Sequence, residues 1–379
     1  MKLLYISQHF NRSNIGAQMH YKAITEIVNS SNIYVVDLNM DSSKRRIHNY
    51  IAFGKYPSKF NRIKRWLQGN SMYIENCQIN ECCELIEREK IDCVFVETSN
   101  VGNIVKKIKK KCPQIRVITF YHDIEAFLFR QWRKNKKSIV DKIETTIALR
   151  QEKLSANFSD LNICFHQRDV ALFKQAYGDR AILNIPIATT IPQISDNCKK
   201  RVTGIDETKT ILFVGTSYFP NILGLRWFME NVFPQLIGNF QIQIVGRGLD
   251  VLRKEFSDER IKISGFVDSL QSFYESADIV IAPIFIGGGM KAKTAEALSY
   301  GKNFLGTPES LVGYWEELSS VVKNSVVFCE DSSQEWIIIL NGLISSEVEK
   351  YNIDLGEEFG CKFSFDVLKN NLNKVLVEK

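Results

Sequence analysis

The feature that most constrains the fold is residues 277–301, where an apolar run is followed by three glycines and a helical pattern. The run at 279–282 has the length and β-branched character of a strand buried on both faces. Pro283 ends it because proline has no N–H for a strand ladder, and glycines then let the chain turn without Cβ clashes. A helix start after a glycine loop presents free N–H groups, which predicts an anion site.

Charged side chains strengthen this prediction. Lys291 and Lys293 add positive charge where the helix is expected to begin, and Glu296 lies one turn further on. A lysine at a helix start is usually solvated, but the adjacent glycines favour phosphate binding for Lys291. A carboxylate at Glu296 could accept hydrogen bonds from two ribose hydroxyls if its helix face turns inward. The pattern is typical of a nucleotide-diphosphate site.

Length and composition restrict the class of protein. A chain of 379 residues is long enough for two domains, and 45% hydrophobic and 24% charged residues are ordinary for a soluble globular protein. No apolar run approaches the ~20 residues that span a bilayer, and the first residues lack a signal-peptide pattern. Nine cysteines without metal or disulfide spacing indicate reduced thiols. We therefore expect a cytoplasmic protein.

The order of elements predicts the fold class. Short apolar strands alternate with helical patterns, which favours parallel sheets with right-handed crossovers. Residues 187–208 interrupt the alternation with prolines and polar residues, as an interdomain linker does. We expect an α/β protein of two Rossmann-like doubly wound domains facing a cleft that holds the ligand. The expected parts are an N-terminal acceptor-side domain at 1–186, the linker, a donor domain at 209–362, and a C-terminal helix at 363–379 that packs back on the first domain.

Two loops of the second half follow expected strands. Gly215 ends one strand, and the hydroxyl-bearing loop with Ser217 can approach a phosphate; alternatively, Ser217 or Asn221 caps the next helix. Arg247 stands in a glycine turn after the next strand, where it can face a diphosphate or solvent; a dinucleotide fingerprint is not formed there. Phe266 and Val267 follow a third strand and suit a nucleobase edge, or Phe266 belongs to the core.

The first half offers one candidate for chemistry. His122 follows the expected strand 116–120 in the motif His-Asp-x-Glu, and ligand sites of α/β proteins form at such positions. An imidazole with a pKa near neutral can orient a hydroxyl or transfer a proton. A structural histidine held in a loop is the alternative. No sequence pattern predicts a metal site or a cofactor, so we expect neither.

Charge is unevenly distributed. Residues 1–200 contain 32 Lys and Arg against 19 Asp and Glu, which is +13, whereas residues 201–379 contain 17 against 24, which is −7. Basic and aromatic residues concentrate at 44–66 and 130–137. These segments can be solvated faces, a nucleic-acid patch or a surface for anionic lipid. Because no nucleic-acid motif is present, we rank lipid or a phosphorylated acceptor higher and expect no nucleic-acid partner.

Together these motifs resemble the GT-B glycosyltransferases, in particular the retaining family-4 type known as glycosyl transferases group 1. The segment FVGTSYFPNILGLRWFMENVFPQL is similar to the first strand and helix of the family's donor domain. The segment from ISGFVDSL to YGKNFLGT is similar to its donor site, in the branch G-(S/G)-G-x-K-x-K-x-x-E-A. In the first half, the resemblance extends only to Gly16, which we expect in the loop before a helical segment at 17–28, and to the motif at His122.

The resemblance implies a nucleotide-sugar donor, no cofactor, and a glycan or polyprenyl-linked acceptor for a cell-surface polysaccharide. His122, Lys291 and Arg247 would carry the chemistry by facing the sugar and stabilising the departing diphosphate. Donor contacts would come from Gly16, Ser217, Phe266, Val267, Gly287, Gly288, Gly289 and Glu296. The family commonly has a second glutamate eight residues before the one matched by Glu296, but Gly288 stands there, so the resemblance implies no particular sugar.

Three functions fit these observations. The first is a glycosyltransferase on the cytosolic face of a membrane, independent of metal and in contact with anionic lipid. The second is a sugar-nucleotide epimerase or hydrolase on the same scaffold, for which clustered carboxylates and histidines would be expected. The third is a non-catalytic subunit that binds nucleotide sugar, which Gly288 favours. Turnover of donor with and without acceptor separates the three.

Overall fold

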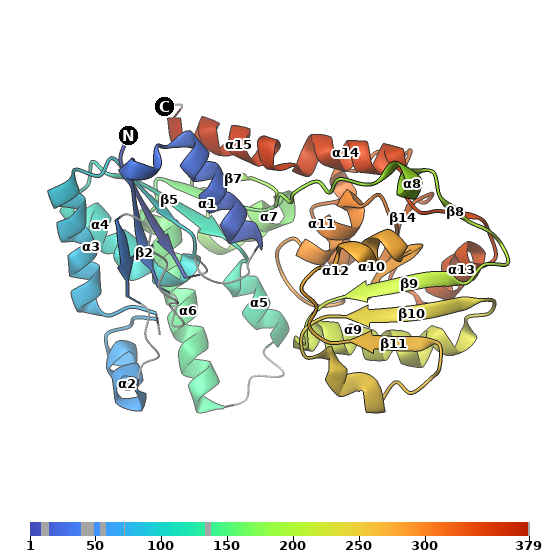
Figure 1. Ribbon diagram of the computed structural model, residues 1–379. Coiled ribbons are helices and arrows are strands. Elements are labelled where there is room, and N and C mark those ends of the chain that lie inside the picture. The colour runs from blue at the N-terminus through green and yellow to red at the C-terminus, as the bar shows by residue number, and fades with distance from the viewer. Residues whose placement is uncertain (9–14, 39–48, 54–57, 72, 133–137, 378–379) are drawn as a thin grey trace. The chain divides into compact units, whose positions relative to one another are not determined.

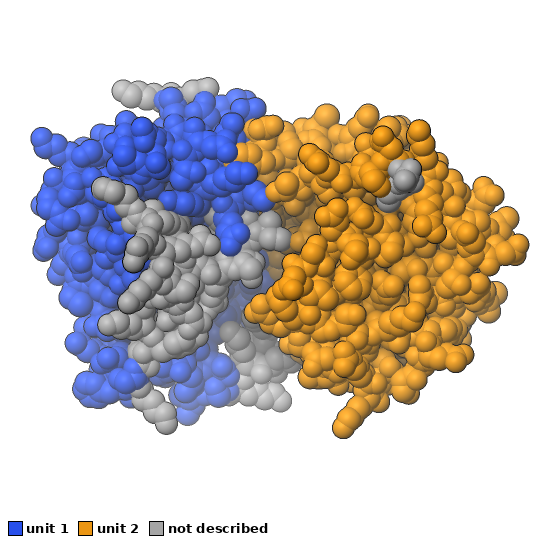
Figure 2. All heavy atoms as spheres, viewed as in Figure 1, with its two compact units in different colours: residues 1–186, 368–379 blue, residues 187–367 orange. Residues whose placement is uncertain are grey.

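The computed structural model describes residues 1–8, 15–38, 49–53, 58–71, 73–132 and 138–377. The chain divides into two compact units (Figure 2): Met1–Pro186 with Leu368–Lys379, and Ile187–Val367. Each unit contains a parallel sheet with helices on both faces (Figure 1), which confirms the expected α/β class with two Rossmann-like domains.

Among the described residues, the sheet of the first unit has seven parallel strands in the order β3-β2-β1-β4-β5-β6-β7. Strands β1 and β4 are buried along their whole length, as their continuous apolar sequences predict. The strand order reverses between them, and ligands of such sheets bind at that point. The strands are β1 (Leu3–Ser7), β2 (Ile33–Asp37), β3 (Tyr50–Ala52), β4 (Cys93–Val96), β5 (Arg116–Tyr121), β6 (Leu161–Cys164) and β7 (Ile182–Asn184).

Helices cover both faces of this sheet. The longest, α6, begins after Ser138, whose hydroxyl accepts a hydrogen bond from the N–H of Asp141 at 3.1 Å in a capping box. The last helix of the chain returns to this unit, where Lys369 pairs with Glu26 of α1 at 3.0 Å. The helices are α1 (Ile15–Ile27), α2 (Lys59–Leu67), α3 (Asn76–Glu89), α4 (Gly102–Lys111), α5 (Glu125–Trp132), α6 (Ile139–Phe158), α7 (Gln167–Tyr177) and α15 (Phe365–Val377).

The sheet of the second unit has six parallel strands in the order β11-β10-β9-β12-β13-β14. Its order reverses between β9 and β12, so the apolar run at 279–282 lies at the centre of the sheet as strand β12. The strands are β9 (Lys209–Val214), β10 (Phe240–Val245), β11 (Ile261–Ser264), β12 (Ile279–Ala282), β13 (Asn303–Gly306) and β14 (Val327–Cys329). The helices are α9 (Phe219–Asn231), α10 (Gln271–Ser276), α11 (Ala292–Ser299), α12 (Pro308–Leu311), α13 (Ser333–Ile344) and α14 (Ile353–Phe363).

The segment 187–208, which we expected to be a linker, lies within the second unit. It contains the short helix α8 (Asp196–Lys199) and strand β8 (Val202–Thr203), which pairs antiparallel with β15 (Val348–Glu349). The backbone N–H of Thr189 also donates to the carbonyl of Phe363 at 3.1 Å. Its polar composition was typical of a linker, but strand pairing with a distant residue is not visible in composition.

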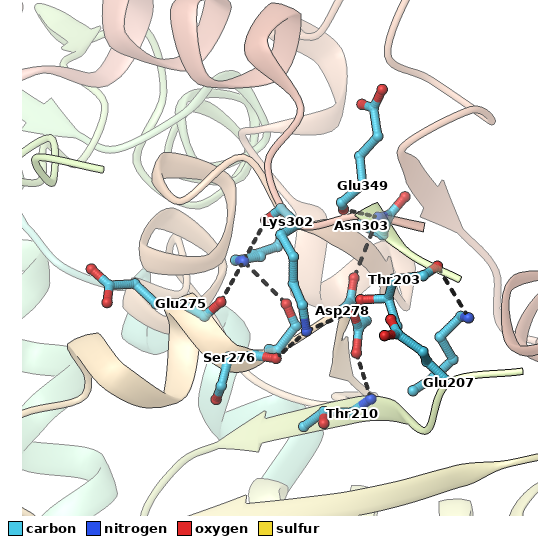
Figure 3. A network of polar contacts seen from close by, with 12 residues as sticks. Thr203, Glu207, Thr210, Glu275, Ser276, Asp278, Lys302, Asn303 and Glu349 are labelled. Atoms are coloured by element: carbon cyan, nitrogen blue, oxygen red, sulfur yellow. Dashed lines mark hydrogen bonds and ion pairs between the residues drawn. The ribbon is translucent and has the colours of Figure 1, made fainter. Parts of the chain in front are cut away.

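A buried polar network holds the amino ends of the strands in the second unit (Figure 3). Asp278, which immediately precedes β12, is fully buried. Its carboxylate lies 2.7 Å from Lys350 Nζ and accepts hydrogen bonds from the N–H of Thr210 at 2.7 Å and from the hydroxyl of Thr203. Lys302, equally buried, donates to the carbonyl of Ala277 at 3.1 Å. This network fixes the amino ends of the strands. The loops predicted to bind the donor lie at the opposite, carboxyl ends.

Candidate functional site

The carboxyl ends of the parallel strands in the second unit bring the predicted donor loops to one edge. Ser217 follows β9, Arg247 follows β10 and Phe266 follows β11, which are neighbouring strands. The N–H of Ser217 donates to the carbonyl of Arg247 at 3.0 Å. The Arg247 guanidinium lies 5.0 Å from the centre of the Phe266 ring, a cation–π contact. Three residues predicted separately from sequence thus form one group.

The structure excludes one alternative each for Phe266 and Ser217. Phe266 is 63% exposed, so the core alternative is wrong and its ring is available at the strand edge beside Val267. Helix α9 has Tyr218 at its N-cap position without a side-chain hydrogen bond, so Ser217 does not cap it. Arg247 stands between Gly246 and Gly248. A Cβ at Gly246 would lie 1.6 Å from the carbonyl oxygen of Gly215, which explains the glycine turn.

The glycine loop after β12 forms the other half of the edge. Gly287 and Gly289 have φ values of 152° and 57°, a backbone that side chains rarely tolerate, and Gly288 lies between them. Lys291 is the N-cap residue of α11, and its Nζ donates to the carbonyls of Gly288 at 3.0 Å and Gly289 at 2.9 Å. The ammonium group is therefore held against the loop at the start of the helix.

Lys291 has an acidic partner that the sequence did not indicate. Its Nζ lies 2.8 Å from Glu309 Oε1, and both side chains are largely buried. Glu309 belongs to α12, directly after β13, so the next strand of the sheet supplies the carboxylate. The hydroxyl of Tyr314 donates to the carbonyl of Lys291 at 3.0 Å, which fixes the backbone of the same residue. The cation is positioned by three separate segments.

Lys293 connects helix α11, which follows β12, with helix α9, which follows β9. The strand order reverses between these two strands. Lys293 Nζ donates to the side-chain carbonyl of Asn221 in α9 and lies 4.6 Å from the centre of the Phe213 ring. The amide of Asn221 donates in turn to the carbonyl of Thr216 at 2.9 Å. Burial, and then the charge of Lys291, lower the pKa of Lys293 to about 7. An anion at this edge would meet the ammonium group of Lys291, the amine of Lys293, which is only partly protonated near pH 7, and the start of α11.

Glu296 lies one turn into α11, partly buried. Its Oε2 accepts a hydrogen bond from the hydroxyl of Tyr274 at 2.9 Å, and the ring of Tyr274 stacks on that of Tyr300. Burial raises the pKa of Glu296, and the Tyr274 hydroxyl and Lys293 offset part of this effect. The Tyr274 hydroxyl therefore orients the Glu296 carboxylate. Its contact with ribose, which the resemblance implies, remains a prediction.

The first unit contains a separate polar cluster around a buried carboxylate. Glu97 directly follows β4, and its Oε1 lies 2.7 Å from His20 Nδ1 and 3.0 Å from His122 Nε2. The hydroxyl of Tyr5 in β1 donates to Oε2 at 3.0 Å. Burial acts to raise the pKa of Glu97, but the charges and hydrogen bonds of the two histidines outweigh it, and the pKa falls to about 2.

This cluster sits at the reversal of strand order in its own sheet, between β1 and β4. Gly16 lies within the first turn of α1, so our expectation of a loop there is wrong; the helix begins at Ile15, before the expected start at residue 17. His20 follows Gly16 by four residues, which places the two on the same helix face. His122 keeps a partly exposed side chain, whereas Glu97 and His20 are fully buried.

Sequence reasoning missed Glu97, His20 and Glu309. Glu97 follows a buried strand directly, which is the rule that selected His122 and could have selected Glu97 as well. Across the described ranges, no group of three or more His, Cys, Asp or Glu side chains is arranged to hold a metal ion. In the Glu97 cluster, one carboxylate oxygen contacts two imidazoles.

Comparison with known proteins supports the resemblance. Residues 208–345 match the family described as "Glycosyl transferases group 1". A Klebsiella pneumoniae protein, described as "Uncharacterized 44.6 kDa protein in cps region", is 25% identical over 236 residues, and the match covers 57% of each chain. The chain thus matches little more than half the length of this curated relative.

Solved structures match over the whole chain. The lipopolysaccharide outer core galactosyltransferase WaaB, in its apo form, has a TM-score of 0.68 and 13% identity and covers 99% of each chain. HepE of Anabaena, in complex with UDP and glucose, has a TM-score of 0.69 and 15% identity and covers 100% of each. At this identity the likeness concerns the fold. The chain therefore has the GT-B fold, and its segment 208–345 matches the family model of glycosyl transferases group 1.

Proposed function

We propose that this protein transfers a sugar from a nucleotide-diphosphate donor to a glycan or lipid-linked acceptor in cell-surface polysaccharide synthesis. The observation that carries the proposal is the cationic edge of the second unit, where Lys291 and Lys293 lie at the start of α11 beside the glycine loop. Oxygen anions of a diphosphate suit such an edge. The HepE structures contain UDP, UDP with glucose, and UDP-glucose, which supports a uridine donor.

Transfer requires that negative charge on the departing diphosphate be stabilised. Lys291, Arg247 and the N–H groups at the start of α11 provide fixed positive charge without reorganisation. We propose that they do so without a metal, that Glu296 accepts hydrogen bonds from ribose, and that Phe266 faces the base. Retention of configuration, in which the leaving phosphate takes the acceptor proton, is part of the proposal and follows from the family resemblance.

His122 is proposed to face the donor sugar. The Glu97 carboxylate lies 3.0 Å from His122 Nε2, and we propose that this contact sets which ring nitrogen is turned to the sugar. The acceptor is proposed to be lipid-linked and presented at the cytosolic face of an anionic membrane. Names of relatives support this class of product: WaaB is a lipopolysaccharide galactosyltransferase, and the Klebsiella protein is encoded in a cps region.

A thermal-shift screen tests the donor part. The full-length protein is mixed with UDP, GDP, CMP and their sugars, and we expect one nucleotide to raise the melting temperature. Lys291→Ala should abolish that rise without unfolding the protein. Lys262→Ala, which removes an exposed lysine bonded to Gln241, should retain it. An unchanged rise in Lys291→Ala would refute the phosphate placement, and no rise with any nucleotide in the wild type would refute the proposed donor class.

Release of nucleoside diphosphate then tests the reaction. The nucleotide sugar that stabilises the protein is incubated with and without a lipid extract as acceptor. Release that depends on the extract supports transfer. Release without acceptor identifies a hydrolase, and conversion of the donor sugar without release identifies an epimerase. Binding with neither release nor conversion identifies a non-catalytic subunit, and each of these three results would overturn the proposal.

A further inference from the structure

Helix α2 of the first unit exposes an apolar face. Phe60, Ile63 and Leu67 are 76%, 51% and 84% exposed. Their spacing of three and four residues places them on one side of the helix. A helix of a globular domain ordinarily turns such a face toward the core. Here the polar side carries Arg65, which is buried and pairs with Glu75 at 3.1 Å, so the helix is attached through its charged side.

The start of α6 adds to this surface. Ile139, Val140 and Ile143 are 76%, 42% and 36% exposed. Arg62 of α2 forms an ion pair with Glu144 of α6, and further along both segments Gln151 donates to the carbonyl of Gly69. Both contacts join residues that are 82 positions apart in the chain, so the two helices run side by side in the same direction (Figure 1). Phe60 consequently lies level with the first turns of α6.

Basic residues accompany these apolar side chains in the sequence. Residues 42–74 contain eight Lys or Arg and no Asp or Glu, and residues 126–144 contain six Lys or Arg against two acidic residues, Asp141 and Glu144. Within the described helices, Lys64 and Lys142 are exposed. Each basic residue near an anionic bilayer contributes about 1 kcal/mol of attraction. On these two helices the apolar side chains are therefore accompanied by exposed lysines, which attract a negatively charged surface.

We propose that this α2–α6 face, made of Phe60, Ile63, Leu67, Ile139, Val140 and Ile143, docks on an anionic lipid bilayer. A short basic helix with large apolar side chains on one face lies in the headgroup region, where both parts are satisfied. No helix in the described part of the chain is long and apolar enough to cross a membrane, so this is a contact with the bilayer surface. The inference extends the proposed function, because a lipid-linked acceptor resides in such a bilayer.

Other occupants fit the surface less well. A second copy of the chain would bring two basic regions together, and like charges across an interface oppose association. A protein partner would require an interface core depleted of charge, whereas the exposed lysines lie next to the apolar residues on both helices. An anionic bilayer can bury the apolar side chains, and its headgroups attract the lysines.

Flotation with lipid vesicles tests the proposal on the full-length protein. We expect binding to phosphatidylcholine vesicles that contain phosphatidylglycerol, and weak binding to phosphatidylcholine alone. The double variant Phe60→Ser/Leu67→Ser should bind at least about tenfold more weakly, because each large apolar side chain contributes roughly 1.5–3 kcal/mol when buried. Lys64→Glu/Lys142→Glu should weaken binding to the anionic vesicles and reduce its salt dependence.

Matched substitutions on the second unit provide the control. Val251 and Ile338 are also exposed apolar residues, so Val251→Ser/Ile338→Ser should leave vesicle binding unchanged. The circular dichroism spectrum shows whether each variant folds. Equal vesicle binding by both double variants, or no binding by the wild type, would overturn the proposal. So would a concentration-dependent dimer that Phe60→Ser/Leu67→Ser abolishes in the absence of vesicle binding. The vesicle assay contains no nucleotide sugar, so a lack of vesicle binding would not refute the proposed sugar transfer. Likewise, a lack of sugar transfer would not refute vesicle binding.

Discussion

Glu97 Oε1 lies 3.0 Å from His122 Nε2, and the same oxygen lies 2.7 Å from His20 Nδ1. One buried carboxylate thus orients two imidazoles that come from a helix near the start of the chain and from the loop after β5. A hydrogen bond to one ring nitrogen of a histidine determines which tautomer the other nitrogen presents. The geometry makes Glu97 a positioning residue for His122.

Glu97→Gln is expected to lower the rate of sugar transfer by about 10- to 100-fold, because hydrogen bonds to charged groups contribute roughly 1.5–3 kcal/mol. An amide cannot accept hydrogen bonds with the strength of a carboxylate from both imidazoles. Nucleotide binding by the second unit should be unchanged, which a thermal shift measures. Glu26→Gln, at an exposed carboxylate of the same unit, serves as the control. Wild-type transfer by Glu97→Gln would show that His122 does not depend on this contact.

Lys293 should make stability depend on pH. Its pKa is about 7 in the folded chain against 10.5 ordinarily, so between these values the unfolded state binds more protons. The free energy of unfolding should therefore rise as the pH increases from about 7 toward about 10. Lys293→Met should remove this increase. Urea unfolding at several pH values measures it, with Lys262→Met as an exposed control. An identical slope in Lys293→Met would assign the dependence to another group.

The network at Asp278 should be important for stability. Asp278→Ala removes one partner of a buried ion pair and leaves Lys350 uncompensated, so we expect a loss of about 3–5 kcal/mol. Asp258→Ala breaks an ion pair with Arg260 that is about one-third exposed, and should cost at most about 1 kcal/mol. Urea unfolding of both variants gives the comparison. Equal losses would mean that the network at the amino ends of the strands contributes little.

Two glycines should respond in opposite ways to alanine. Gly246 has a φ of 143°, and a Cβ there would lie 1.6 Å from the carbonyl oxygen of Gly215. Gly246→Ala should therefore displace the loops that carry Ser217 and Arg247, lowering both the melting temperature and nucleotide binding. Gly342 lies in α13 with open space around its Cβ position. Gly342→Ala should stabilise the protein by about 0.5–1 kcal/mol. Tolerance of Gly246→Ala in both measurements would refute the close packing of these loops.

Local patterns in the sequence were sufficient for the α/β class. Runs such as 93–96 and 279–282 are apolar at every position, which is typical of strands covered on both faces, and the structure places both beside a reversal of strand order. Strand β3 was not predicted from the sequence, because a strand of three residues that are not buried is too short to show a hydrophobic periodicity. Strand pairing by β8 was equally invisible, because two residues within a polar segment carry no pattern.

The sequence alone determined that the chain forms two parallel sheets, that a glycine loop precedes α11, and that positive charge is concentrated in the first half. Those features depend on residues that are close together in the sequence, so they can be predicted from local patterns. Only the tertiary structure decided that Glu97 meets His20 and His122, that Lys291 meets Glu309, and that α2 leaves its apolar face exposed. Such contacts depend on the order of strands in a sheet and on which helices lie side by side, and both are settled by packing between residues far apart in sequence.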